Sequence, residues 1–257
     1  MQKAQMASLF AVATFAMCSA TSPAAANLLL NGSFEAPIVP GSSSSCGAIF
    51  NTDCQGYYSP DQPGFPGGPS DIAGWTVIGK GGASGVAVVL QFGPNYTEGN
   101  GSGGTLHFHA QSGNQSLDLT GEGNQGLTNG VKQSAATGSG IDYRLSFYVG
   151  NQDDSAPGYV NPSSIVLFID GSEIQTFTTP DVTANDVSWR HFHYDFTAAA
   201  ALTTIAFLNG TDVGDNFAGL DHVSLNAISA VPEPGPLGLI FSGVVTSFIL
   251  RRRKAAR

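Results

Sequence analysis

The stretch that decides the fold is WRHFHYDFTA, residues 189–198. Apolar rings at positions 192, 194 and 196 alternate there with polar side chains at 191, 193 and 195. Successive side chains of a β-strand point to opposite faces of a sheet, so this period of two predicts a strand with one buried face. Residues 144–150, RLSFYVG, alternate in the same way and predict a second strand of this kind.

Shorter runs of the same character fill the chain between residues 27 and 230, separated by Gly, Asn, Asp and Pro, and none shows a sustained helical period. FIDGSEIQTF, residues 168–177, predicts a hairpin with Asp170-Gly171 as its turn. Strands are predicted near residues 27–30, 74–78, 86–91, 105–109, 115–119, 130–134, 143–150, 165–170, 173–178, 189–197, 203–208 and 219–226. Many short strands between turn signals predict an all-β fold, a single β-sandwich domain.

The N-terminus carries an export signal by its pattern. Lys3 is the only early charge, an apolar stretch runs from about Met6 to Cys18, and the small residues 24–26 follow. This order predicts a secretory signal peptide over residues 1–26. An N-terminal membrane anchor is disfavoured, because the apolar run is too short to span a bilayer.

The C-terminus predicts a membrane segment. Residues 236–250 carry no charge, and weakly polar residues from Val231 onward extend them toward the ~20 residues of a span. The basic residues Arg251, Arg252, Arg253, Lys254 and Arg257 follow at once. Positive flanks stay on the cytoplasmic side, so the preceding domain is expected outside the cytoplasm. A nucleic-acid-binding tail is disfavoured, because the basic cluster adjoins an apolar span.

This ending, residues 231–257, resembles a PEP-CTERM sorting signal. The resemblance is carried by Val231, Pro232, Glu233 and Pro234, by the span, and by the arginines at 251, 252 and 253. It implies recognition by an exosortase in a Gram-negative bacterium that makes extracellular polysaccharide. The protein is then expected in the cell envelope or outside the cell, anchored in the membrane at least transiently. An uncut single-span anchor is the alternative.

The charge of the domain excludes some partners. Between residues 27 and 230, 18 acidic side chains outnumber four basic ones, which gives a formal charge of −14. Nucleic acids and anionic membranes require basic surfaces, so neither is an expected partner of the domain.

Residues 38–70 are rich in Ser, Pro and Gly and predict a long inserted loop. Cys46 and Cys54 within it are expected to form a disulfide in an exported chain.

Several segments in order resemble the bacterial choice-of-anchor C type domain, which is akin to galactose-binding-like jelly rolls. They are NLLLNGSFEAP, IAGWTV, GNQSLDLTG, YRLSFYVGN, WRHFHYDFTA, TTIAFLNG and GLDHVSL. The resemblance implies a single jelly-roll β-sandwich with a carbohydrate-binding or wall-associated role. The cysteine-bearing insertion departs from the family, and so does His222, where such domains often have Asn or Asp.

The same resemblance implies one structural calcium. In related modules an acidic residue after the first strand and another in the last strand help to hold the ion, and here these are Glu35 and Asp221. The alternative is that Glu35 caps a turn and that Asp221 accepts hydrogen bonds from nearby backbone.

Sugar binding requires flat rings and hydrogen-bonding groups at the surface. The candidates lie on predicted loops: Tyr57, Tyr58, Tyr96, Asn151, Asp153, Asp154 and Tyr159. Trp75 and Trp189 occupy strand patterns and are expected in the core. The histidines form two pairs, His107/His109 and His191/His193, and the members of each pair share one strand face. Either pair could hold a metal ion. The favoured interpretation is that they are polar residues on a solvent face, with Phe108 and Phe192 on the opposite, buried face.

No catalytic set is found in the sequence. Asp153 and Asp154 are adjacent on one predicted loop, whereas a glycosidase needs two separated carboxylates that flank the bond. We therefore expect an exported, non-enzymatic protein that binds extracellular polysaccharide. The alternatives are a purely structural surface or biofilm protein that binds no sugar, and a glycan-active hydrolase.

Overall fold

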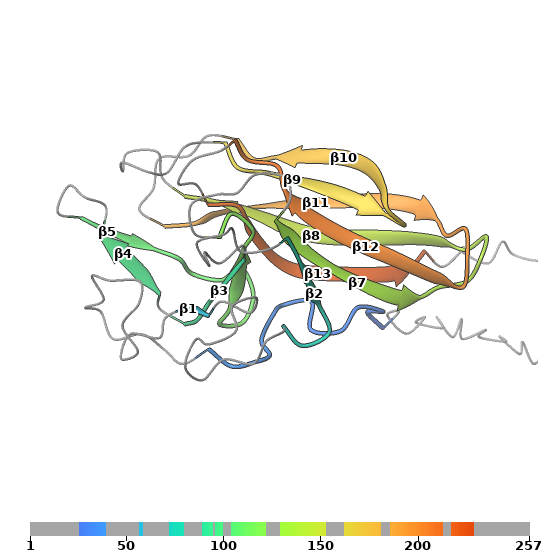
Figure 1. Cartoon of the computed structure of the whole chain (residues 1–257), viewed down its shortest axis with the longest axis horizontal. Coiled ribbons are helices and arrows are strands. Elements are labelled where there is room, and N and C mark those ends of the chain that lie inside the picture. Colours follow the sequence, from blue (N-terminus) through green and yellow to red (C-terminus); the bar gives the residue numbers. More distant parts are fainter. Residues whose placement is uncertain are drawn as a thin grey trace, which may run out of the picture.

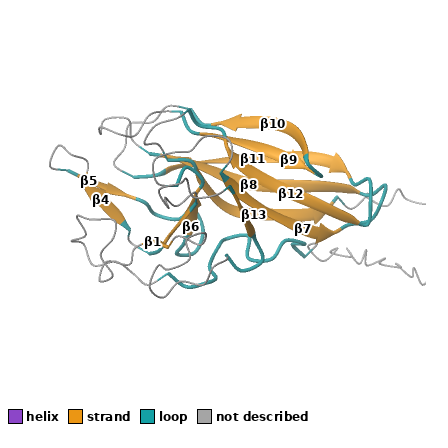
Figure 2. Ribbon diagram, viewed as in Figure 1, coloured by secondary structure: helices purple, strands orange, loops and turns teal. Residues whose placement is uncertain are grey.

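A computed structural model describes residues 26–39, 57–58, 72–79, 89–94, 96–99, 104–121, 129–152, 162–180, 186–212 and 217–228, with only the backbone at 57–58. These residues form strands, turns and irregular segments and include no helix (Figure 2). The strands are β1 (Tyr57–Tyr58), β2 (Thr76–Ile78), β3 (Leu90–Phe92), β4 (Thr97–Gly99), β5 (Thr105–His107), β6 (Ser116–Asp118), β7 (Gly130–Ala136), β8 (Asp142–Asn151), β9 (Ser164–Ile169), β10 (Ser172–Thr178), β11 (Ser188–Thr197), β12 (Leu202–Asn209) and β13 (Gly219–Ala227).

The strands form two antiparallel sheets and a separate hairpin. The first sheet has the order β1-β3-β6-β13-β8-β11 and the second the order β10-β9-β12-β7-β2. The hairpin of β4 and β5 lies at one end of the sandwich (Figure 1). The predicted all-β sandwich is therefore confirmed.

The main core lies between the two sheets. β8 contributes Leu145, Phe147 and Val149, all of which are fully buried. The ring of Phe147 contacts that of Phe207 from β12 at a centroid distance of 4.9 Å. Trp75 is buried in this core, as predicted from its strand pattern, and its Nε1 donates to the carbonyl of Leu30. Burial of each such side chain stabilises the fold by about 1.5–3 kcal/mol.

A second, smaller core covers part of the outer face of the first sheet. It consists of Leu90, Phe92, Leu106, Phe108 and Phe217, with Tyr96 and Val187 packed against it. Leu90 and Phe92 flank Gln91, which is buried on the opposite side of β3, so this cluster lies outside the sandwich. It covers the β3 side of the sheet and leaves the outer face of β8 and β11 uncovered.

The predicted hairpin at Asp170-Gly171 is confirmed, because both residues have positive φ and join β9 to β10. The strand predicted at 27–30 is wrong. There the side chain Oδ1 of Asn27 accepts from the N–H groups of Leu29 and Leu225, so an Asn-centred turn replaces the strand ladder. The short strands β1 and β4 were not predicted.

Several predictions lie outside the described residues. They are all but the last residue of the signal peptide at 1–26, most of the insertion at 38–70 with Cys46 and Cys54, and the C-terminal signal at 231–257 with its segment 236–250. Within the described part of the chain, no helix is long and apolar enough to cross a membrane.

Candidate functional site

The uncovered outer face of β8, β11 and β13 carries a group of rings. We call this surface the ring face and define it by Tyr148, Trp189, His191, His193 and His222. Leu145, Phe147 and Val149 of β8 point into the core, so Ser146 and Tyr148 point outward. His191 lies directly opposite Tyr148 and His193 opposite Ser146, which places both histidines on the same outer face.

The rings of this face lie side by side. Tyr148 has its centroid 4.9 Å from that of His191 and 5.9 Å from that of His222. The rings of His191 and His193 are 6.3 Å apart. The three imidazoles are exposed and the phenol ring is half-buried, so an open row of flat surfaces runs across three neighbouring strands.

Trp189 lies at the end of this row because two glycines leave room for it. It faces Gly150 of β8, which in turn faces Gly219 of β13. A Cβ atom at Gly150 would come within 2.8 Å of the indole, and one at Gly219 within 2.9 Å. The indole therefore lies across both strands, half-buried, with a centroid 6.5 Å from that of Phe217. Trp189 was expected in the core; the structure places it on the outer face.

His222 joins the ring face through an irregularity of β13. The register of β13 against β8 shifts between Asp221 and Ser224, and His222 has φ of 50°. Such a bulge redirects a side chain that regular alternation would point elsewhere. Here the neighbours Asp221 and Val223 are buried and His222 is exposed beside Tyr148.

Hydrogen-bonding side chains continue the face beyond the rings. Ser146, Ser224 and Asn226 are half-buried on the same rows of β8 and β13. Arg144 donates two hydrogen bonds to Asp195, of 2.8 and 2.7 Å. The bond from Arg144 holds the pKa of the Asp195 carboxyl below its usual value, and the same bond raises the pKa of Arg144.

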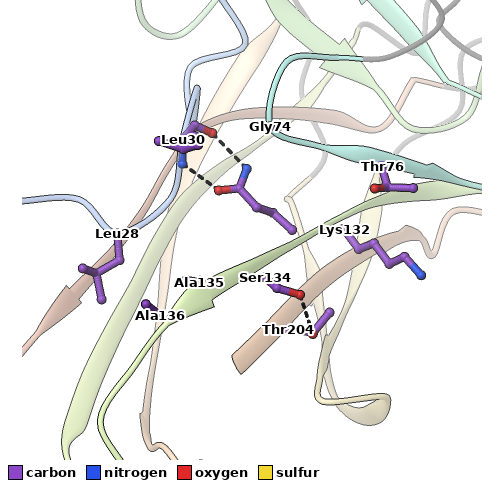
Figure 3. Close-up of a pocket in the computed structure, with 10 residues that line it drawn as sticks. Leu28, Leu30, Gly74, Thr76, Lys132, Ser134, Ala135, Ala136 and Thr204 are labelled. Carbon is purple, nitrogen blue, oxygen red and sulfur yellow. Dashed lines mark hydrogen bonds between the residues drawn. The ribbon is translucent and has the colours of Figure 1, made fainter. Parts of the chain in front are cut away.

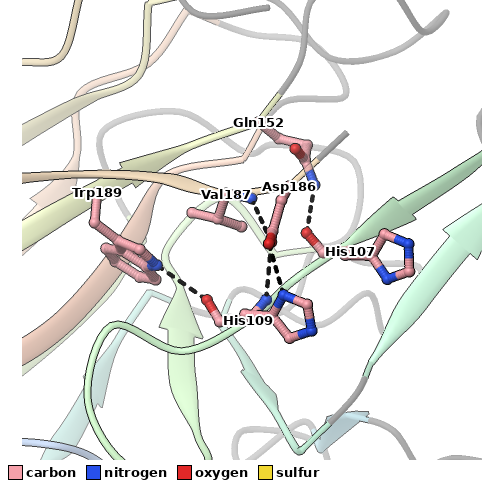
Figure 4. A network of polar contacts seen from close by, with 6 residues as sticks. All are labelled: His107, His109, Gln152, Asp186, Val187 and Trp189. Carbon is pink, nitrogen blue, oxygen red and sulfur yellow. Dashed lines mark hydrogen bonds and ion pairs between the residues drawn. The ribbon is translucent and has the colours of Figure 1, made fainter. Parts of the chain in front are cut away.

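A rim of polar contacts adjoins Trp189 (Figure 4). Nε1 of Trp189 donates to the carbonyl of His109, and Nδ1 of His109 lies 2.6 Å from Oδ2 of Asp186. Nε2 of Gln152 donates to the carbonyl of His107. These bonds hold residues 107–109 against residues 186–189. The rim therefore keeps a fixed position beside the indole.

The favoured prediction is confirmed for three of the four paired histidines, whereas His107 is half-buried. Phe108 is buried in the second core and Phe192 is partly buried against the main core, while His109, His191 and His193 are exposed. In the described part of the chain, no three His, Cys, Asp or Glu side chains form a group that could hold a metal ion.

Glu35 and Asp221, the predicted calcium pair, hold one loop between them. Oε1 of Glu35 accepts from the N–H groups of Asn114 and Gln115, and Oδ2 of Asp221 accepts from that of Ser112. Gly113 at the centre of this loop has φ of 73°, and a Cβ there would collide with the Glu35 carboxylate. Both carboxylates thus accept hydrogen bonds from the backbone of this loop, and the binding of calcium by the pair stays a prediction.

Burial also affects the protonation of this pair. It raises the pKa of Asp221 to about 7, and the nearby charge of Glu35 acts in the same direction. The backbone N–H of Gln111 also bonds to Asp221, while Oε1 of Gln111 is buried with no hydrogen-bond donor. Neither carboxylate forms an ion pair with a described Lys or Arg side chain. Among the residues that the structure describes, several oxygen acceptors therefore lie in this region without a Lys or Arg partner.

Of the residues predicted to bind sugar, the structure describes the side chains of Asn151 and Tyr96. Asn151 is fully buried at the end of β8 and its amide donates to the carbonyl of Pro180. Tyr96 is half-buried, stacked on Phe92 at 4.5 Å, and its hydroxyl donates to Glu98. Tyr57 and Tyr58 are described only as the backbone of β1, and Asp153, Asp154 and Tyr159 lie outside the described residues.

A shallow groove lies on the other sheet (Figure 3). Its volume is ≈ 480 Å³, and Leu30, Lys132, Ser134, Ala136 and Thr204 are among the side chains that line it. Ser134 and Thr204 hydrogen-bond to each other. The lining contains aliphatic and hydroxyl groups but no aromatic ring, so this groove offers no stacking surface for a sugar.

No protein-family model matches the chain, and a search of curated proteins finds no match either. Similar solved structures include one described as "CBM4 structure and function", with 15% identity and a TM-score of 0.38 over 78% of this chain and 99% of the other. The CBM22-1 xylan-binding domain from Paenibacillus barcinonensis has 15% identity and a TM-score of 0.36 over 74% of this chain and 100% of the other. A cycloisomaltooligosaccharide glucanotransferase from Paenibacillus sp. has 14% identity and a TM-score of 0.34 over 52% of this chain and 18% of the other. Likenesses of this degree carry no argument about the ligand or activity of this chain.

Proposed function

We propose that the protein is an exported, non-enzymatic carbohydrate-binding module of the jelly-roll type, and that polysaccharide binds on its ring face. The observation that carries the proposal is the position of Tyr148 between His191 and His222 on an exposed sheet face, with Trp189 at the end of the row.

The chemistry of sugars fits this surface. A pyranose ring presents an apolar face of C–H bonds and a rim of hydroxyl groups. Flat rings pack against the C–H face, and the hydroxyls of Ser146 and Ser224 with the amide of Asn226 supply donors and acceptors in the next rows. The surface is open rather than a closed pocket, which suits an internal segment of a long chain.

The experiment compares two single variants of the full chain by isothermal titration with a panel of polysaccharides that includes the matrix of the producing cell. Tyr148→Ala removes the central ring of the face. Thr204→Ala removes a hydroxyl in the groove of the other sheet and serves as the control. We expect Tyr148→Ala to weaken binding at least tenfold, a loss of about 1.4 kcal/mol, and Thr204→Ala to bind like the parent.

Two results of this experiment would contradict the proposal. Absence of binding to every polysaccharide would favour the purely structural surface protein. Release of reducing ends from a bound polysaccharide would favour the glycan-active hydrolase.

The termini support the cellular part of the proposal. A signal peptide, a Pro-Glu-Pro motif and a basic flank after an apolar run are the sequence features of an exosortase substrate, and such a protein is delivered to the cell surface. Mass spectrometry of the mature chain tests this directly. A chain that keeps Arg251 to Arg253 would show that the tail is not removed.

We also propose that Glu35 and Asp221 hold one structural calcium. Buried acceptors without an opposing positive charge fit a cation that prefers oxygen ligands, and the unpartnered Oε1 of Gln111 fits the same chemistry. The ion would supply positive charge between the two carboxylates and would fix the 111–115 loop beside His222. This role is structural and includes no chemical step.

A further inference from the structure

Most basic side chains of the described residues lie on or beside the strands of the ring face. All five histidines of the chain are described: three lie on the ring face itself, and His107 and His109 form its rim. Of the three Lys and Arg side chains within the described residues, Arg144 is on β8 and Arg190 on β11. The domain as a whole has a formal charge of −14, and Lys132 on β7 is the one basic side chain among the three described that lies away from these strands.

β11 is the strand that collects these groups. It is the edge strand of its sheet, and it carries Arg190, His191 and His193 within four residues. All three are exposed. His191 and His193 point to the ring face, and Arg190, which faces Val149, lies on the other side of the strand. A ligand on the ring face therefore meets two imidazoles at its open edge.

The acidic groups near these imidazoles have other hydrogen-bond partners. The charged and titratable groups that face them are Tyr148 and Arg144 from β8, Asp195 from β11, His222 and Asp221 from β13, and Arg190 across the strand. Asp195 is bound by Arg144 through two hydrogen bonds. Asp221 is buried and accepts from loop amides. Asp221 is thus not free to pair with a protonated imidazole, whereas Asp195, although bound by Arg144, also attracts His193.

We propose that the ring face binds polysaccharides that carry carboxylate groups, with His191 and His193 as imidazolium partners of those carboxylates. This inference rests on the proposed function, because it names the class of sugar that the same face binds. A protonated imidazole has two N–H donors and a positive charge. Uronate rings retain the C–H face that packs on Tyr148 and add a carboxylate at the ring edge.

The proposal predicts a dependence on pH with a definite sign. Histidine ordinarily ionises near pH 6.5, whereas sugar carboxylates stay ionised well below that. Acidification from about pH 7.5 to about pH 5.5 therefore adds positive charge to the face without removing negative charge from the ligand. Two partly exposed charge pairs together are expected to tighten binding about tenfold.

The experiment uses the full chain and matched pairs of polysaccharides at constant ionic strength. Polygalacturonate, alginate and hyaluronate are each titrated beside their methyl esters, which keep the ring and lose the charge. The His191→Gln/His193→Gln double variant removes both imidazoles from an exposed surface. Lys132→Gln removes a positive charge from the other sheet and controls for the change in net charge.

We expect at least one of the acidic polysaccharides to bind about tenfold more tightly at the lower pH, and its methyl ester to show no such change. The histidine double variant should lose this dependence on pH, whereas Lys132→Gln should retain it. Equal binding of each acid and its ester at the lower pH would overturn the inference while leaving the proposed function intact. Retention of the pH dependence by the double variant would also overturn it. Failure of the panel and of neutral polysaccharides alike would instead reject the proposed function.

Discussion

Trp189 lies directly opposite Gly150 across the β8–β11 pair, and its indole occupies the space that a side chain at position 150 would fill. The positions of the two residues are therefore coupled. The indole can lie over the sheet only while β8 carries no side chain at this point.

The first prediction concerns the packing of the Trp189 indole on Gly150. Gly150→Ala would place a methyl group within 2.7 Å of Val187 and 2.8 Å of the indole, so the ring must move. Overpacking of this kind costs about 1–3 kcal/mol, and we expect a loss of that size in urea unfolding together with weaker polysaccharide binding. Gly99→Ala is the matched control, because a Cβ there meets nothing within 4 Å. Equal stability of both variants would show that the indole is not held by Gly150.

The second prediction concerns His222, which has φ of 50° at the bulge. Asparagine also tolerates this conformation, so His222→Asn should keep the bulge and change the free energy of unfolding by no more than about 0.5 kcal/mol. The substitution removes a ring beside Tyr148, and we expect polysaccharide binding to weaken by about threefold to tenfold, or 0.7–1.4 kcal/mol. If the variant binds polysaccharide as tightly as the parent and is equally stable, His222 does not contribute to binding.

The third prediction concerns calcium. If Glu35 and Asp221 hold an ion at 100 times its dissociation constant, the ion stabilises the fold by about 2.7 kcal/mol. Treatment with a chelator should then lower the melting temperature by roughly 5–10 °C for a domain of this size. Glu35→Gln should lower the melting temperature before any chelator is added, and the chelator should then cause no further decrease. Glu173→Gln changes an exposed residue, and this variant should still respond to the chelator. If the chelator leaves the melting temperature unchanged, hydrogen bonds alone hold the 111–115 loop.

The sequence could predict the strands but not the surface that they form. Alternation along residues 144–150 and 189–198 identified Phe147 and Phe192 as facing the main core, and His109, His191 and His193 were correctly predicted to be exposed. The register that sets His191 beside Tyr148 comes from pairing across about 40 residues, which no local pattern encodes. The bulge at His222 breaks the alternation on which the prediction depends.

The errors have the same origin. Asn151 and Tyr96 follow turn-forming residues and were predicted at the surface. The long strand β8 instead extends to Asn151 and buries it, and Tyr96 stacks on Phe92 in a second core formed by distant segments. Trp189 lies outside the core because its indole packs over Gly150 and Gly219, which have no side chains. The local sequence around either glycine does not predict this packing.

The last prediction concerns the pH dependence of stability and Asp118. Complete burial raises the pKa of this carboxyl to about 7, although Oδ1 accepts hydrogen bonds from the N–H and hydroxyl groups of Thr120 and from the N–H of Ala218. In the unfolded chain the same group ionises near pH 4. The folded state therefore binds more protons between about pH 4 and pH 7, so the free energy of unfolding contributed by Asp118 falls as the pH rises through this window.

Asp118→Asn tests this sign. The amide keeps an oxygen acceptor at Oδ1 and cannot ionise. We therefore expect the variant to be more stable than the parent at about pH 7 by on the order of 2–4 kcal/mol, and similar to it at about pH 4.5. Urea titrations at both pH values measure the difference, and they are done with chelator present so that the coupling of calcium to Asp221, whose pKa is also raised by burial, does not contribute. Ser116→Ala, in the same strand, controls for a general loss of packing in β6. If Asp118→Asn is instead less stable than the parent at the higher pH, the carboxylate is ionised in the folded protein and the three donors outweigh the cost of its burial.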